Sequence, residues 1–114
     1  MGIRDIGSAG GHILDVNNGD YGNTETYYKV FELGIHGFKY FSMRYVIQAT
    51  TITIEVSNGG GVWWDETNAF LGAANATATG DAMVNTPLPW LYARVKAVTT
   101  NATNALDLYL CLVK

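Results

Sequence analysis

The side chains that could carry out chemistry are few and lie far apart in the sequence: two histidines and one cysteine. His12 and His36 each stand alone, whereas a metal site on a β-barrel would need closely spaced histidines with a carboxylate. Cys111 has no adjacent histidine or cation to activate its thiol, so we predict a packed or interface thiol. We therefore expect no catalytic residues, no metal, no cofactor and no enzymatic activity.

One run of aromatic and acidic residues, Trp63-Trp64-Asp65-Glu66, is typical of carbohydrate sites, where carboxylates lie beside aromatic platforms. Successive residues of a strand point to opposite faces, so Trp63 and Trp64 cannot both line one platform. Two interpretations stay open. Either one tryptophan is in the core and the other in an interface, or one of them forms a sugar platform with Asp65 and Tyr92.

Alternation of apolar and polar residues predicts the strands that must position these side chains. Such strands are expected within residues 39–48, 51–56, 91–98 and 105–113, and aromatic and β-branched residues predict another from residue 26. Residues 62–65 read as a short aromatic strand, and residues 66–80 as a loop with a short strand or one helical turn. The residues predicted to face inward are Phe41, Met43, Tyr45, Ile47, Ile52, Ile54, Val56, Leu91, Ala93, Val95, Ala97, Leu106, Leu108, Leu110 and Leu112.

These strands predict an all-β fold, an antiparallel β-sandwich or barrel, because turn signals separate them and no long helix is indicated. Residues 25–114 would form the sandwich domain. Residues 1–24 hold six of the 13 glycines together with three asparagines, so we expect a loop-rich N-terminal arm. This arm would be either a loosely ordered terminus or a tail that becomes ordered on a partner.

Composition excludes several classes of protein. The formal net charge is -3, and the sequence has no basic run that would indicate nucleic-acid binding. No apolar stretch reaches the ~20 residues that cross a bilayer, so we expect no membrane partner, and the first residues lack the apolar region of a secretion signal. We expect a protein made in the cytoplasm. Only 15% of residues are charged, below the ~25% of typical domains, so part of the surface is expected to be shielded from water.

The strand faces that should be exposed to solvent are unusually apolar. Tyr109, Cys111 and Val113 alternate with the four leucines of the last strand, and Tyr92 lies on the same face of its strand as Arg94. A loop or the N-terminal arm could cover these faces. The other explanation is burial against a symmetry-related copy or within a larger assembly.

The stretch from Phe41 to Val113 resembles small virion structural proteins of tailed bacteriophages. The resemblance lies in Thr53-Ile54-Glu55-Val56-Ser57 with the glycine turn and Trp63, in Pro89-Trp90-Leu91-Tyr92-Ala93-Arg94-Val95, and in the closing strand 106–112. It covers about two-thirds of the chain, and Asn58 stands where the family pattern has an aspartate before the turn glycine.

This resemblance implies a jelly-roll-like sandwich on the outer capsid surface of a virion, acting as a capsid decoration or cement protein. Its partners would be the major capsid protein and further copies of itself, with a trimer favoured over a dimer. The alternative is a carbohydrate- or receptor-binding module of a tail fibre or baseplate. The residues expected in the capsid or oligomer interface are Arg4, Asp5, Ile6, Tyr92, Tyr109 and Cys111.

Overall fold

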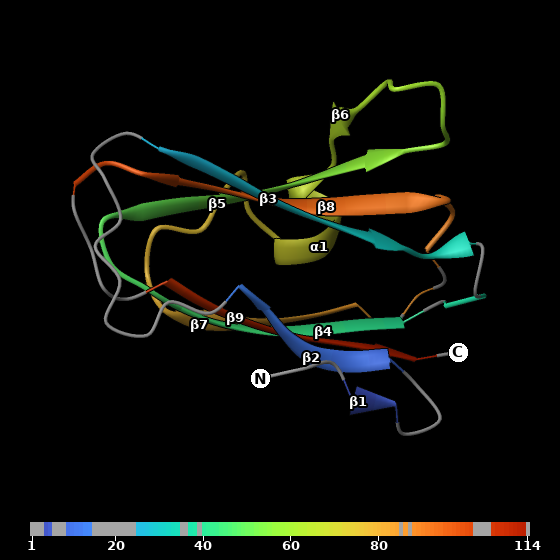
Figure 1. The fold of residues 1–114 in the computed structure, drawn as a ribbon, viewed down its shortest axis with the longest axis horizontal. Coiled ribbons are helices and arrows are strands. Elements are labelled where there is room, and N and C mark those ends of the chain that lie inside the picture. Colours follow the sequence, from blue (N-terminus) through green and yellow to red (C-terminus); the bar gives the residue numbers. More distant parts are fainter. Residues whose placement is uncertain are drawn as a thin grey trace.

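The computed structural model describes residues 4–5, 9–14, 25–34, 37–38, 40–84, 86, 88–101 and 106–113, which form two antiparallel sheets packed face to face (Figure 1). One sheet has the order β1-β2-β9-β4-β7 and the other the order β3-β8-β5-β6. The elements are β1 (Arg4–Asp5), β2 (Ala9–Leu14), β3 (Thr26–Glu32), β4 (Tyr40–Ile47), β5 (Thr50–Ser57), β6 (Trp64–Asp65), α1 (Thr67–Leu71), β7 (Gly80–Val84), β8 (Tyr92–Thr99) and β9 (Leu106–Val113). The predicted all-β sandwich is confirmed.

Strands β2 to β9 pair in a nested order. β2 pairs with β9, β3 with β8, β4 with β7, and β5 with β6. Two further pairings, β4 with β9 and β5 with β8, join these nested pairs into the two sheets. Residues far apart in the sequence are therefore neighbours across the strands, as Arg94 and Glu55 are.

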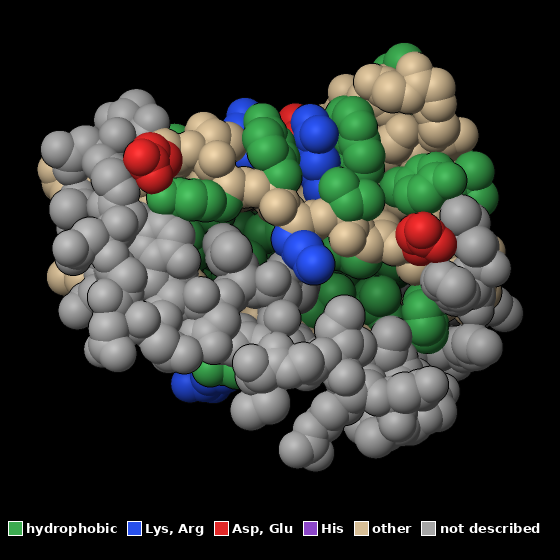
Figure 2. Space-filling model, in the orientation of Figure 1, with side chains coloured by type: hydrophobic (Ala, Val, Ile, Leu, Met, Phe, Trp, Pro, Cys, Tyr) green, Lys and Arg blue, Asp and Glu red, His purple; other side chains and the backbone are tan. Residues whose placement is uncertain are grey.

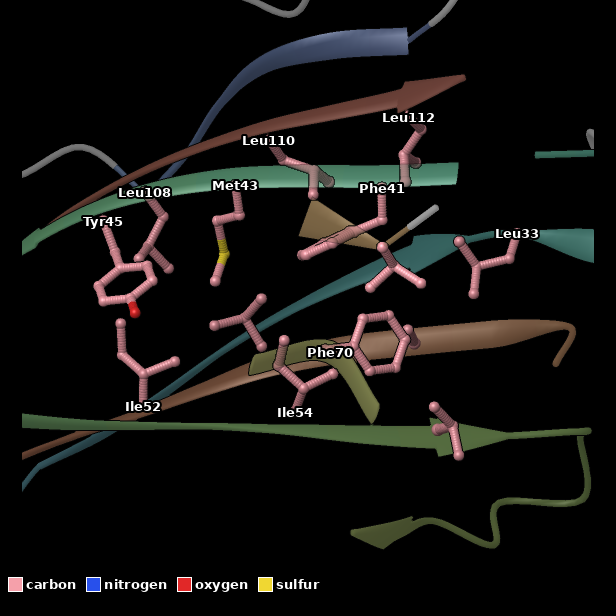
Figure 3. Close-up of a cluster of buried hydrophobic side chains, with 14 of the residues drawn as sticks. Leu33, Phe41, Met43, Tyr45, Ile52, Ile54, Phe70, Leu108, Leu110 and Leu112 are labelled. Atoms are coloured by element: carbon pink, nitrogen blue, oxygen red, sulfur yellow. The ribbon is translucent and has the colours of Figure 1, made fainter. Parts of the chain in front are cut away.

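The core lies between the sheets and contains most of the inward positions that alternation predicts, together with Leu33, Phe38, Phe70, Val84 and Leu88 (Figure 3). Fourteen of the fifteen predicted inward residues are buried, with Ile52, Ile54 and Val56 of β5 fully so. The exception is Leu91, which precedes β8 and is 40% exposed. Period-two patterning was sufficient here because a half-buried strand shows its buried face directly in the sequence.

Helix α1 is the one helical turn that was expected as an alternative for residues 66–80. It ends at Gly72, whose left-handed backbone (φ 71°) lets its N–H bond to the Asn68 carbonyl at 2.9 Å. Phe70 of α1 points into the core, where its ring contacts Phe41 edge to face at 5.1 Å. The strand β7, which follows, was not predicted because its glycine, aspartate and alanine give a weak strand pattern.

The N-terminal arm was predicted to be loop-rich, and this expectation is wrong for residues 4–5 and 9–14, which form β1 and β2. β2 pairs with β9, with Gly10 opposite Cys111 and His12 opposite Tyr109. Glycines hide strand periodicity, while the edge of β9 offers hydrogen-bonding groups that a local reading of the sequence cannot see. β1 and β2 thus belong to the same sheet as β9.

Candidate functional site

The most distinctive side-chain arrangement is a cation held between two aromatic rings on the outer face of the sheet β3-β8-β5-β6. The guanidinium carbon of Arg94 lies 4.4 Å from the ring centroid of Tyr28 and 4.3 Å from that of Trp63. Both distances are within the range of cation–π attraction. Two cation–π contacts thus hold the Arg94 side chain.

An ion pair fixes the same guanidinium in its plane. Nε of Arg94 donates to Oε1 of Glu55 at 2.7 Å, and the two side chains are only 22% and 20% exposed. A short charge-assisted hydrogen bond of this kind also defines the orientation of the group. Arg94 is therefore held in one orientation by Tyr28, Trp63 and Glu55 together.

Strand register explains why these residues meet. Ala93 and Val95 are buried, so Arg94 between them points outward, opposite Val30 on β3 and Glu55 on β5. Tyr28 lies two residues before Val30 and therefore shares its face. Trp63 arrives from the turn at residues 59–61, where three glycines with positive φ reverse the chain before β6.

The surroundings of Arg94 are apolar and accessible. Tyr28 is 49% exposed and Val30 is 47% exposed, although both belong to a regular strand. In Figure 2, Lys and Arg side chains lie between hydrophobic side chains along the top of the molecule, where this sheet runs. We call this surface the Arg94 face and define it by Tyr28, Val30, Glu55, Trp63, Tyr92, Arg94 and Lys96.

Of the residues considered for a sugar platform, Trp63, Asp65 and Tyr92 share the outer face of the sheet, and Trp64 does not. Trp63 packs against Arg94 on the outer face, whereas Trp64 pairs with the buried Val56 and so lies toward the inner side of the sheet. Asp65 Oδ1 accepts hydrogen bonds from the Thr67 hydroxyl at 2.6 Å and from the Thr67 N–H at 2.8 Å. One ring face of Trp63 and one carboxylate oxygen of Asp65 are already engaged within the chain.

The Thr67 contacts also lower the pKa of Asp65 below its usual value. The hydroxyl hydrogen bond has the largest effect and the backbone N–H the next, while burial acts in the opposite direction and Lys96 adds a favourable charge. Because the carboxyl is largely exposed, this shift describes a structural anchor and gives no sign of a catalytic acid.

The residues predicted for the capsid or oligomer interface are divided between two surfaces. Tyr92 belongs to the Arg94 face. Tyr109 is 44% exposed and Cys111 is half-buried, and both lie on the outer face of the other sheet, on the opposite side of the sandwich. They therefore do not form one continuous surface.

The arm residues of that predicted interface lie near the second surface. Arg4 and Asp5 form β1, paired with β2 at the edge of the sheet that contains β9, and Ile6 lies outside the described residues. The same outer face carries an ion pair between Arg44 and Asp81 at 3.3 Å, with side chains 62% and 68% exposed. This ion pair is far more exposed than the pair between Arg94 and Glu55.

Sequence reasoning did not identify Tyr28 and Arg94 as a site. The alternation in residues 91–98 places Arg94 on the solvent-exposed face, but its partner Glu55 is 39 residues away in the sequence. The pairing of β8 with β5 and β3 brings Arg94 to Glu55 and Tyr28, and the turn before β6 brings Trp63 to it.

The described part of the chain contains no group of three or more His, Cys, Asp or Glu residues placed to hold a metal ion. Nor does any helix of the described part have the length and apolar character needed to cross a membrane. Comparison of the chain with models of protein families, with curated proteins and with solved structures found no match.

Proposed function

We propose that this chain is a non-enzymatic structural protein of a tailed-phage virion, a capsid decoration protein that binds the major capsid protein on the outer surface of the head. The observation that carries the proposal is the Tyr28–Arg94–Trp63 stack on an accessible sheet face. The resemblance to small phage virion proteins is the reason for naming the phage head as the particle and the major capsid protein as the partner.

The composition of the Arg94 face fits a protein interface. Tyrosine, tryptophan and arginine are the residue types that contribute most to binding energy at such interfaces. Arg94 is already fixed by two rings and Glu55, so little side-chain entropy would be lost when a partner covers it. Exposed Tyr28 and Val30 supply apolar area beside it.

The strand order supports a jelly roll within this proposal. A jelly roll is a double-sheet fold of eight strands built from two Greek keys, and it is frequent in viral capsid proteins. The eight strands from β2 to β9 pair in the same nested way: β2 with β9, β3 with β8, β4 with β7, and β5 with β6. Such nesting is what results when one long antiparallel hairpin is wrapped into two sheets.

Attachment to heads assembled without this chain tests the proposal. The purified chain is mixed with such heads, and the bound fraction is measured by co-sedimentation over a concentration series. We expect saturable attachment, weakened about tenfold or more by Tyr28→Ser, since tyrosine is enriched among the interface residues whose loss costs about 2 kcal/mol or more.

Tyr109→Ser is the matched control, because Tyr109 has similar exposure (44% against 49%) on the opposite outer face. It should attach like the unchanged chain. Failure of the unchanged chain to attach would overturn the proposed function. Loss of attachment with Tyr109→Ser alone would instead move the contact to the other face.

A further inference from the structure

The guanidinium of Arg94 has hydrogen-bonding capacity that the described residues do not use. Within that part of the chain its hydrogen bond runs from Nε to Glu55, and its two terminal amino groups have no acceptor. The guanidinium carbon lies over both rings, and 22% of the Arg94 side chain is exposed. A planar donor edge is therefore presented in a fixed orientation on a face that is only partly covered.

The charges around Arg94 define the acceptor that fits. Lys96 is the next outward residue of β8, and Glu55 and Asp65 are the outward residues of β5 and β6 in the same row. Glu32, opposite Tyr92, is a further outward carboxylate on β3. With two cations and three carboxylates, this side of the sheet has no surplus positive charge to attract a polyanion such as a nucleic-acid backbone. A single carboxylate matches the planar donor edge of one guanidinium.

We infer that Arg94 binds an aspartate or glutamate carboxylate on the protein partner of the Arg94 face. This inference rests on the proposed function, in which the partner is the major capsid protein, and it names the chemistry of the contact. The partner's acidic side chain accepts from the terminal amino groups of Arg94, and apolar side chains around it cover Tyr28 and Val30. Glu55 keeps the guanidinium in place from the other side.

Arg94→Lys and Glu55→Gln separate this contact from a purely structural role. Lysine keeps the charge but loses the planar donor edge, so attachment to heads that lack the chain should weaken about tenfold or more. Glutamine at position 55 can still accept from Nε, while it removes a negative charge close to the incoming carboxylate. Attachment of Glu55→Gln should therefore tighten, by roughly threefold, and should depend more steeply on salt.

Arg44→Lys on the opposite outer face is the matched control and should attach unchanged. Glu55→Gln weakening attachment as Arg94→Lys does would mean that the ion pair only maintains the fold, and this would overturn the inference. Equal attachment of Arg94→Lys and the unchanged chain would also overturn the inference, but it would leave the proposed function intact. Failure of the unchanged chain to attach removes the function and the inference together. Should Arg94→Lys fail to fold, as judged by circular dichroism, Glu55→Gln decides alone.

Discussion

At the scale of single residues, one buried hydroxyl at the start of α1 joins β5 to β6. Thr67 is 1% exposed, and its hydroxyl accepts from the Ile54 N–H at 2.8 Å while it donates to Asp65 Oδ1. The backbone of β5 thereby gains a partner beyond the two-residue strand β6. Asp65 is the exposed end of this network, so its protonation reports on it.

The substitution Asp65→Asn should lower the free energy of unfolding at neutral pH, and this difference from the unchanged chain should disappear in acid. The pKa of Asp65 is lowered in the folded chain, so its carboxylate stabilises the fold above the usual value of 3.8, and this contribution disappears as the pH falls through the lowered folded value. We expect a difference of at most about 1 kcal/mol, because water screens a largely exposed carboxyl. Urea unfolding at pH 7 and at successively lower pH measures how this difference shrinks.

Asp81→Asn controls for the change in net charge, because Asp81 lies in the exposed pair with Arg44 on the other sheet. A difference between Asp65→Asn and the unchanged chain that did not shrink as the pH fell would show that the loss comes from something other than the carboxylate.

At the scale of elements, alternation predicted the inward faces of β4, β5, β8 and β9 because each of these strands is buried on one face only. It did not predict β2 or β7, whose glycines and small residues give no periodic signal. The Arg94 face was missed for a related reason. Its members come from β3, β5, β8 and the turn before β6, and no local pattern encodes which strands become neighbours.

Deletion of residues 1–24 should therefore destabilise the sandwich rather than remove a free tail. β2 lies along β9 in five residue pairs, and its loss leaves that edge of β9 unpaired. We expect unfolding free energy to fall by on the order of 3 kcal/mol, with each ladder hydrogen bond contributing about 1 kcal/mol. Thermal and urea unfolding give the value.

Deletion of residues 1–8 is the matched control, since it removes β1 but leaves β2 in place. It should unfold close to the full chain. Equal stability of the full chain and the longer deletion would contradict a supporting role for β2, and would restore the arm as a candidate for binding a partner.

At the scale of the whole molecule, exposed apolar side chains on both outer faces predict that the chain associates with itself. Tyr28 and Val30 are exposed on one face, and Tyr40, Met83 and Tyr109 on the other, so one partner surface cannot cover both. Light scattering should give a small multiple of the 12.4 kDa chain mass, with the trimer favoured over the dimer. The mass should persist at 1 M salt, because apolar contacts are not screened. A chain that stays at 12.4 kDa at every concentration would exclude self-association, and dissociation by salt would assign it to charges instead.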